Sequence, residues 1–367
     1  MKQYCPLPFA NGSNFRISFT TFLTHFRFYN MSKLTVAVLV TLIILSGCGN
    51  NNTPDVSNIK ADITIARFDK DFFQTDTLQL MQGLNAVQKK YPYFFNDFIQ
   101  NIVLSGPADS GLQLPAVVGA YITHTRPLYD SVQIKFNNLQ NLDQELKKGF
   151  QFVKYYFPDY PVPKVVTYVG LIGDPSVALT RNALAIGLQM FLGKNFSAYN
   201  TPEAIDKFPQ YISRRFEPQY ITVNCLQNIA SDIYPDNTKG SSLIEQMIEK
   251  GKQWYLTDKF LPAAADSLKT GFTQTQLDWC KNNEGLVWNF IIQNNDVYTT
   301  EPNIIQNFIG EAPKTDGMPD ASPGNIGQWI GWQIVKTFAE KNPALSPKQV
   351  VETNAKKIFE EAKYKPK

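Results

Sequence analysis

The stretch SPGNIGQWIGWQIV, residues 322–335, carries the clearest packing signal in this 367-residue chain. Gly327 and Gly331 lie one helical turn apart, so a neighbouring backbone can approach closely along that side of a helix. Trp329 and Trp332 flank the resulting groove. Glycine inside a helix costs about 1 kcal/mol relative to alanine, so close packing or ligand access must compensate. The pattern favours core packing, and a groove for a partner or ligand is the alternative.

Further helices are predicted around this stretch by capping boxes, in which a Ser or Thr precedes a Glu or Gln by three residues. Ser242 and Glu245 form such a box before a helix over residues 243–256. Thr273 and Gln276 form a second box, before a helix that carries Trp279 and Trp288. Ser346 and Gln349 form the third, with Pro347 at the first helical position.

The sheet signals lie nearer the N-terminus and are few. Residues 165–169 are β-branched and apolar and are bounded by Pro and Gly, which predicts a strand, and residues 63–66 predict a shorter one. Helices are expected over residues 77–90 and 115–157, the latter interrupted near Pro127. The predicted fold class is therefore α+β, predominantly helical with a small sheet near residues 63 and 165.

A charge-free run precedes all of these elements. Residues 34–47, LTVAVLVTLIILSG, are too short for a membrane span of about 20 residues and fit the hydrophobic region of a signal peptide behind Lys33. LSGC at residues 45–48 resembles a bacterial lipobox, so we predict lipidation of Cys48. A buried strand that happens to end in Gly-Cys is the alternative.

This interpretation divides the chain into three parts. Residues 1–47 are an upstream extension plus a lipoprotein signal peptide, with translation expected to start at Met31; a long n-region or a transit peptide are alternatives. Residues 48–60 are the lipidated Cys and a flexible tether. Residues 61–367 form a single helix-rich globular domain.

Removal of the signal changes the charge balance. The lost segment holds four of the 35 Lys and Arg residues and none of the 32 Asp and Glu residues, which leaves a net charge of about −1. Neither a Lys/Arg cluster nor a basic stripe interleaved with aromatic residues occurs in what remains. We therefore expect no nucleic-acid partner.

The few histidines and cysteines restrict the available chemistry. His124 is the only histidine after residue 47, so a zinc site of the His-Glu-x-x-His kind is impossible, and we expect no metal and no cofactor. Without a Gly-x-Ser-x-Gly elbow, His124 is interpreted as structural. Cys225 and Cys280 could pair in an oxidising envelope or remain as two free thiols.

One pair of carboxylates remains as candidate catalytic side chains. Glu245 and Glu249 share a helix face and could together hold a proton or a hard cation. The alternative is a capping residue on a solvated face. Trp254 lies on the same helix. The candidate binding positions are these three residues together with Trp329, Trp332, Gly327 and Gly331.

Seven segments in matching order, from about residue 63 to the C-terminus, resemble the gliding-motility-associated lipoprotein GldB family. They are ARFDK (66–70), KYYFPDYPVPKVVTYVG (154–170), ALAIGLQMFLGKN (183–195), SLIEQMIEKGKQWYLTDKFLP (242–262), TQLDWCKNNEGLVWNFI (275–291), SPGNIGQWIGWQIV (322–335) and YKPK (364–367). The resemblance implies an envelope lipoprotein of the gliding motility and associated secretion apparatus. It also implies a distant similarity to zinc peptidases of zincin-like fold, with the metal ligands lost.

The chain departs from the resembled family at charged positions. The family usually has Arg where this chain has Asn325 and Gln328, and an acid where it has Gln189. If those charges formed a binding pocket, this member has altered it. A divergent paralogue, or a member from a non-gliding species, would show such a change.

The leading hypothesis is a non-catalytic lipoprotein, anchored in the membrane by its N-terminal lipid, that binds protein partners of the motility and secretion machinery. It would face the periplasm, and Gly49 after the lipidated Cys favours the outer over the inner membrane. The rival hypothesis is a carboxylate-based hydrolase acting on envelope peptide or glycan. A third, a small-ligand carrier, would need a closed apolar cavity lined by the tryptophans.

Overall fold

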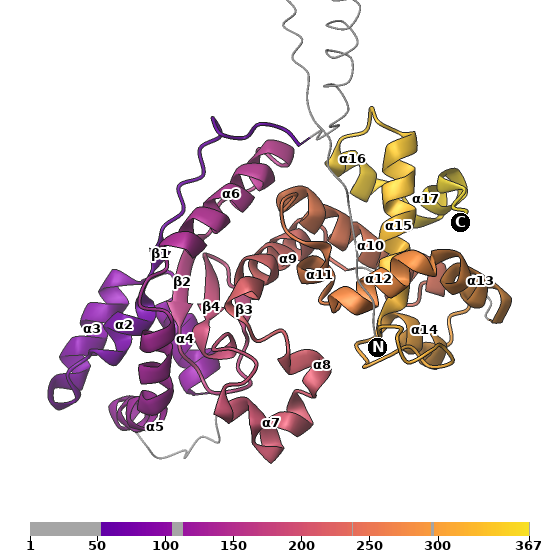
Figure 1. Ribbon diagram of the computed structural model, residues 1–367. Helices are drawn as coiled ribbons and strands as arrows, with labels where there is room; N and C mark the ends of the chain where they lie inside the picture. The colour runs from indigo at the N-terminus through magenta and orange to yellow at the C-terminus, as the bar shows by residue number, and fades with distance from the viewer. Residues whose placement is uncertain (1–52, 105–112, 237, 295–296, 367) are drawn as a thin grey trace, which may run out of the picture. The chain divides into compact units, whose positions relative to one another are not determined.

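One four-stranded sheet is built around strand β2 (Lys164–Tyr168), in agreement with the strand predicted at residues 165–169. The computed structural model describes residues 53–104, 113–236, 238–294 and 297–366 (Figure 1). The strand order is β1-β2-β4-β3; β1 and β4 run parallel to β2, and β3 is antiparallel to β4. The other strands are β1 (Ile65–Ala66), β3 (Val177–Leu179) and β4 (Ala183–Gly187).

The sequence gives weaker signals for the other half of the sheet, and β3 and β4 are not predicted from it. Strand β4 is buried along its whole length, which in a parallel pair produces a continuous apolar run rather than an alternating one. Such a short run cannot be distinguished from a segment of buried helix by its period.

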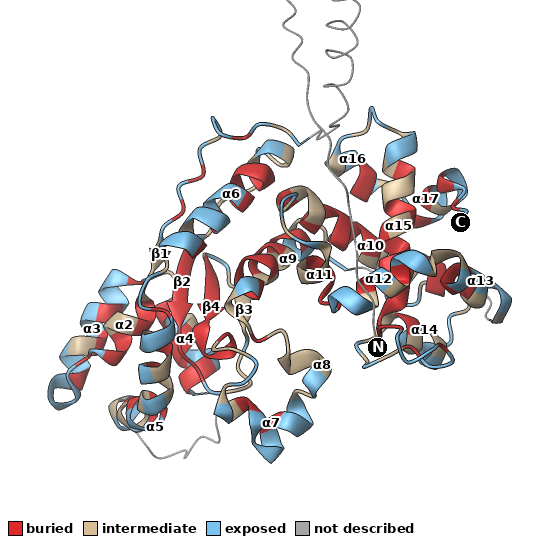
Figure 2. Ribbon diagram, in the orientation of Figure 1, coloured by how far each residue is buried: buried red, intermediate tan, exposed pale blue. Residues whose placement is uncertain are grey.

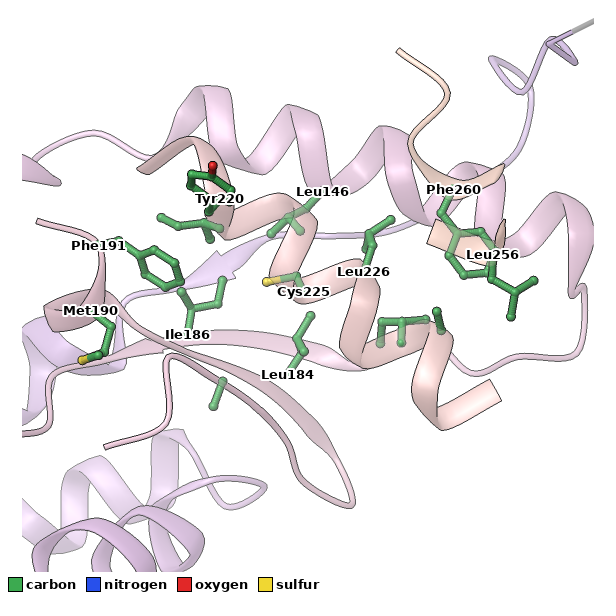
Figure 3. Close-up of a cluster of buried hydrophobic side chains, with 14 of the residues drawn as sticks. Leu146, Leu184, Ile186, Met190, Phe191, Tyr220, Cys225, Leu226, Leu256 and Phe260 are labelled. Atoms are coloured by element: carbon green, nitrogen blue, oxygen red, sulfur yellow. The ribbon is translucent and has the colours of Figure 1, made fainter. Parts of the chain in front are cut away.

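Helices pack on the sheet and bury its apolar side chains. Helix α9 (Ile221–Ile233) contacts β3 and β4, and helix α2 (Phe68–Phe73) contacts β2. Figure 3 shows Leu184 and Ile186 of β4 directed toward Cys225 and Leu226 of α9. Leu146, from helix α6 (Gln140–Tyr156), joins the same cluster, and the burial colours in Figure 2 mark α9 and β4 as mostly buried.

Helical residues outnumber strand residues throughout the described chain, so the prediction of a predominantly helical α+β fold is confirmed. The zincin-like comparison stays a prediction. Before and around the sheet lie α3 (Leu80–Lys90), α4 (Phe95–Phe98), α5 (Leu114–Lys135), α6 (Gln140–Tyr156), α7 (Pro202–Lys207) and α8 (Gln210–Ser213). After α9 come α10 (Leu243–Phe260), α11 (Asp266–Thr270), α12 (Gln274–Asn282), α13 (Glu284–Asn294), α14 (Pro302–Ile309), α15 (Ile326–Lys341), α16 (Pro347–Glu352) and α17 (Ala355–Ala362).

Local sequence motifs predict where helices begin more accurately than where they are interrupted. All three predicted capping boxes are confirmed, at the starts of α10, α12 and α16. The expected interruption at Pro127 is wrong: α5 continues through it and ends at Lys135. The single helix expected to carry Trp279 and Trp288 is also wrong, because α12 ends at Asn282 and α13 begins at Glu284.

A buried ion pair fastens α2 to the sheet. Asp69 is fully buried and accepts hydrogen bonds from Arg67 Nε (2.9 Å) and Nη2 (2.7 Å). Thr167 Oγ1 of β2 donates to the same carboxylate at 2.5 Å, and Gln133 Nε2 of α5 donates at 2.8 Å. The Asp69 charge is therefore fully compensated, a condition under which a buried carboxylate is tolerated.

Helices α10 and α15 form the most extensive contact between any two described elements. A Cβ added to Gly331 would lie 1.7 Å from the Met247 carbonyl oxygen, and one added to Gly251 would lie 2.3 Å from the Gly331 carbonyl carbon. The two backbones therefore touch directly. Gly327 adds to this contact, since its Cβ would meet Phe308 and Met247 at 2.9–3.2 Å. These observations agree with the core-packing interpretation of residues 322–335.

Replacement of Gly331 by Ala is expected to lower the free energy of unfolding by about 3 kcal/mol, the upper range for overpacking, because backbone rather than a flexible side chain blocks the methyl group. Gly119→Ala in α5 is the matched control. Its methyl group would meet only Leu80 Cδ2, at 3.6 Å, so helix propensity should raise stability by up to about 1 kcal/mol. Urea unfolding of both variants measures the difference, and equal effects would contradict the close backbone contact.

Candidate functional site

A polar cavity of about 230 Å³ lies where α9, α10 and the start of α15 meet. Most of its lining side chains are amides and hydroxyls, joined by one indole and three charged groups. They are Arg215, Tyr220, Asn224, Gln227, Ser231, Gln253, Trp254, Thr257, Leu268, Lys269, Thr270, Gly271, Glu311, Asn325 and Gln328. We call this pocket the helical cleft.

A second pocket of about 420 Å³ adjoins the helical cleft and shares Arg215, Asn224 and Gln227 with it. Residues 173–176 and 190–191, which follow β2 and β4, line its other side. This pocket therefore lies outside the carboxyl ends of two parallel strands, a common position for ligands in open sheets. Within it, burial raises the pKa of Asp174, as is frequent at functional sites.

The amides of the helical cleft come from facing sides of two helices. Asn224, Gln227 and Ser231 of α9 lie at spacings of three and seven residues, so they share one helix face. Gln227 Nε2 donates to the Lys269 carbonyl at 2.8 Å, and Gln253 Nε2 of α10 donates to the Tyr234 carbonyl at 3.4 Å. Each of these amide groups keeps its side-chain oxygen for other partners.

Two cations reach the helical cleft, and both are paired. Arg215 Nη1 and Nη2 each donate to one oxygen of Glu311 at 3.1 Å, which makes a bidentate pair. Lys269 is buried and forms ion pairs with Asp258 and Asp266. Burial by itself would raise the Asp266 pKa, but Lys269 and other nearby lysines outweigh it, so that pKa is lowered.

Of the predicted aromatic positions, only Trp254 lines the helical cleft. Its ring meets Trp332 and Phe272 edge to face at centroid distances of 6.0 and 5.9 Å, which fixes its orientation. Trp329 and Trp332 are buried on α15, and neither indole N–H has a hydrogen-bond partner among the described residues. The structure thus separates one cleft tryptophan from two core tryptophans.

The predicted carboxylates Glu245 and Glu249 lie on α10 but do not line the helical cleft. Glu245 accepts hydrogen bonds from the Ser242 backbone N–H at 3.0 Å and from its hydroxyl at 2.6 Å, and these bonds lower the Glu245 pKa. Glu249 accepts from Lys252 Nζ at 2.7 Å, and the Lys252 side chain is fully buried. Burial lowers the Lys252 pKa, and Glu249 opposes that change.

The two cysteines and the histidine of the described residues do not line the helical cleft. Cys225 and Cys280 are both buried and free, which settles the open question of their pairing. Burial raises the pKa of both thiols, that of Cys280 to about 12, so both are poor nucleophiles. His124 lies exposed on α5. Among the described residues, no group of three or more His, Cys, Asp and Glu side chains is arranged to hold a metal ion.

A family model described as gliding motility protein GldB matches residues 49–366, which is almost all of the chain beyond the signal-like segment. The chain belongs to the GldB family. The predicted resemblance is confirmed, and membership implies a gliding motility lipoprotein of the cell envelope. No curated protein and no solved structure matches the chain.

The residues predicted to attach this GldB-family chain to the membrane lie outside the described part. The hydrophobic stretch 34–47 and Cys48 both lie there. Within the described ranges, none of the helices combines the length and the apolar character that a membrane crossing requires. In the segment expected as a tether, Val56 is fully buried, and the Ile59 carbonyl accepts a hydrogen bond from Gln151 of α6 at 3.0 Å.

Sequence reasoning missed most of the cleft of this GldB-family chain. Arg215 and Glu311, its central pair, are 96 residues apart, and no local pattern joins them. The stripe Asn224, Gln227 and Ser231 on one face of α9 was the available signal, although a polar stripe ordinarily indicates a solvated face. Asn325 and Gln328, identified as departures from the family, do line the cleft.

Glu245 is expected to act as a helix cap. Glu245→Ala should lower the free energy of unfolding by about 1 kcal/mol, as the loss of a capping interaction does. Because its folded pKa lies below 4.5, the stabilisation from ionised Glu245 should be complete above pH 4.5 and be lost as the pH falls through the folded pKa. Thermal unfolding of wild type and variant between pH 3 and 7 measures this, and a pH-independent difference would contradict the role.

Proposed function

We propose that this GldB-family chain is a non-catalytic envelope lipoprotein that acts by binding other components of the motility and secretion apparatus. Family membership supports the coarse role. The helical cleft supports a binding role, because amides and hydroxyls that donate and accept hydrogen bonds, together with an indole, are groups that orient a polar ligand. This arrangement of the cleft is the single observation that carries the proposal.

The placement of charge also favours binding over the hydrolase alternative. A carboxylate mechanism needs an acid and a base that converge on one bond. Glu245 and Glu249, on which that alternative rests, are engaged by Ser242 and Lys252 instead. The cleft itself contains one carboxylate side chain, Glu311, and it is paired with Arg215.

Anchoring through a lipid on Cys48 is part of the proposal. Gly49 and an Asn-rich segment follow Cys48, without an acidic run, which favours a periplasm-facing position and the outer membrane. In cells fed labelled palmitate, the wild-type protein should become labelled and Cys48→Ala should not. Cys225→Ala is the matched control, since this thiol is buried and should not be acylated. Label that persists in Cys48→Ala would overturn the anchor.

Binding through the cleft is tested by photocrosslinking in intact envelopes. A photoreactive amino acid in place of Ser231, at the exposed rim of the cleft, should yield adducts that contain motility or secretion components. The same amino acid in place of Lys357, exposed on α17, is the control. Mass spectrometry identifies the adducts. Absence of adducts at Ser231, or identical adducts at both positions, would contradict a binding role for the cleft.

A further inference from the structure

One ion pair of the helical cleft is built differently from the others. Arg215 holds Glu311 in bidentate geometry, and Asn325 Nδ2 lies 3.5 Å from Glu311 Oε1. The Glu311 side chain is nevertheless 47% exposed, and it follows α14 in a segment outside any helix. A carboxylate thus sits in a preformed binding position while its own side chain remains accessible to water.

The other cation of the cleft is not available for exchange. Lys269 is only 4% exposed and is held by two carboxylates, Asp258 and Asp266. Arg215, by contrast, has Glu311 as its only ion-pair partner among the described residues. Arg214 adds positive charge beside it, and burial together with Arg215 lowers the Arg214 pKa. The surroundings of Arg215 would therefore be stabilised by an anion.

The remaining lining is uncharged, and most of its side chains can both donate and accept hydrogen bonds. Side-chain amides come from α9, α10 and the start of α15, and hydroxyls come from Tyr220, Ser231 and Thr257. An amphipathic helix requires an apolar groove, and an extended peptide adds to a sheet edge, whereas neither feature forms this cleft. A compact ligand with hydroxyls on several sides fits it better, and Trp254 supplies a rigid apolar surface for the ligand carbons.

We infer that the helical cleft binds a carboxylate-bearing saccharide, whose carboxylate replaces that of Glu311 on Arg215. Ion pairs that solvent can reach contribute little to stability, and the side chains of this pair are 25% and 47% exposed, so the exchange costs the fold little. Glu311 then occupies the carboxylate position when no ligand is bound. The inference rests on the proposed binding role. It specifies the chemical class of the ligand, and it does not specify which envelope component carries that ligand.

Matched small ligands test this inference on the full-length protein in detergent micelles. N-acetylmuramic acid carries a carboxylate that N-acetylglucosamine lacks, so isothermal titration calorimetry should give an affinity at least tenfold higher for the acid. Glucuronic acid and glucose form a second such pair. Acetyl-alanine and an acetylated dipeptide with a free carboxylate should bind at least tenfold more weakly than the acidic sugars. Equal affinity for acid and neutral sugar, or preference for the peptides, would overturn the inference.

Two variants test the roles of Arg215 and Glu311 separately. Arg215→Gln should abolish the preference for the acidic sugar, whereas Glu311→Gln should raise the affinity for it severalfold by removing the competing carboxylate. Glu361→Gln is the matched control, since Glu361 is a similarly exposed, ion-paired carboxylate outside the cleft (46%) and should have no effect. Near-ultraviolet circular dichroism verifies folding, and a folded Glu311→Gln protein with lowered affinity would refute the exchange.

The outcomes distinguish this inference from the proposed function. If the photoreactive residue at position 231 still captures motility components while every sugar fails to bind, the saccharide inference fails and the binding role stands. If the sugars bind but no envelope adduct forms, the proposed partners are wrong and the ligand chemistry stands. If no sugar binds and no envelope adduct forms, both proposals are refuted.

Discussion

The direct contact between the backbones of α10 and α15 is the constraint on which the helical half of the structure depends. Gly251 and Gly331 leave no room for a side chain between the two helices. Because this contact fixes how the helices cross, it also determines which residues beyond it can meet. Gln253 and Trp254 follow Gly251 within one turn, and Gln328 precedes Gly331 by one turn, so amides of both helices reach the same cavity. The cleft is thus a consequence of helix packing.

The sheet contributes the other wall through α9. One face of this helix buries Cys225 and Leu226 against β4, and its opposite face presents Asn224 and Gln227 to both pockets. Because the apolar face of α9 is packed against the sheet, the orientation of its polar face is fixed as well. The same packing therefore directs the amides toward the pockets. Arg215, which precedes α9, lines both pockets and connects the sheet edge to the helical cleft.

Sequence patterns predicted those features that depend on neighbouring residues. Capping boxes such as Ser242 with Glu245 and the glycine spacing of α15 act within one or two helical turns, where composition determines geometry. Strand β4 was missed because burial on both faces removes the alternation that indicates a strand. The pair formed by Arg215 and Glu311 was missed for a different reason: its geometry exists only after α9, α10 and α15 have packed, and each residue alone resembles an ordinary surface charge.

The charge of the cleft follows from three neighbouring positions. They are Arg215, Asn325 and Gln328. The latter two side chains are neutral: Asn325 lies beside Glu311, and Gln328 Nε2 donates to the Ile309 carbonyl at 2.6 Å. Arg215 is consequently the one cation of the described cleft with an exchangeable partner. A ligand with a single carboxylate can take the place of Glu311 on that cation, whereas a polyanion would carry further charge into a cleft whose other groups can only hydrogen-bond to it.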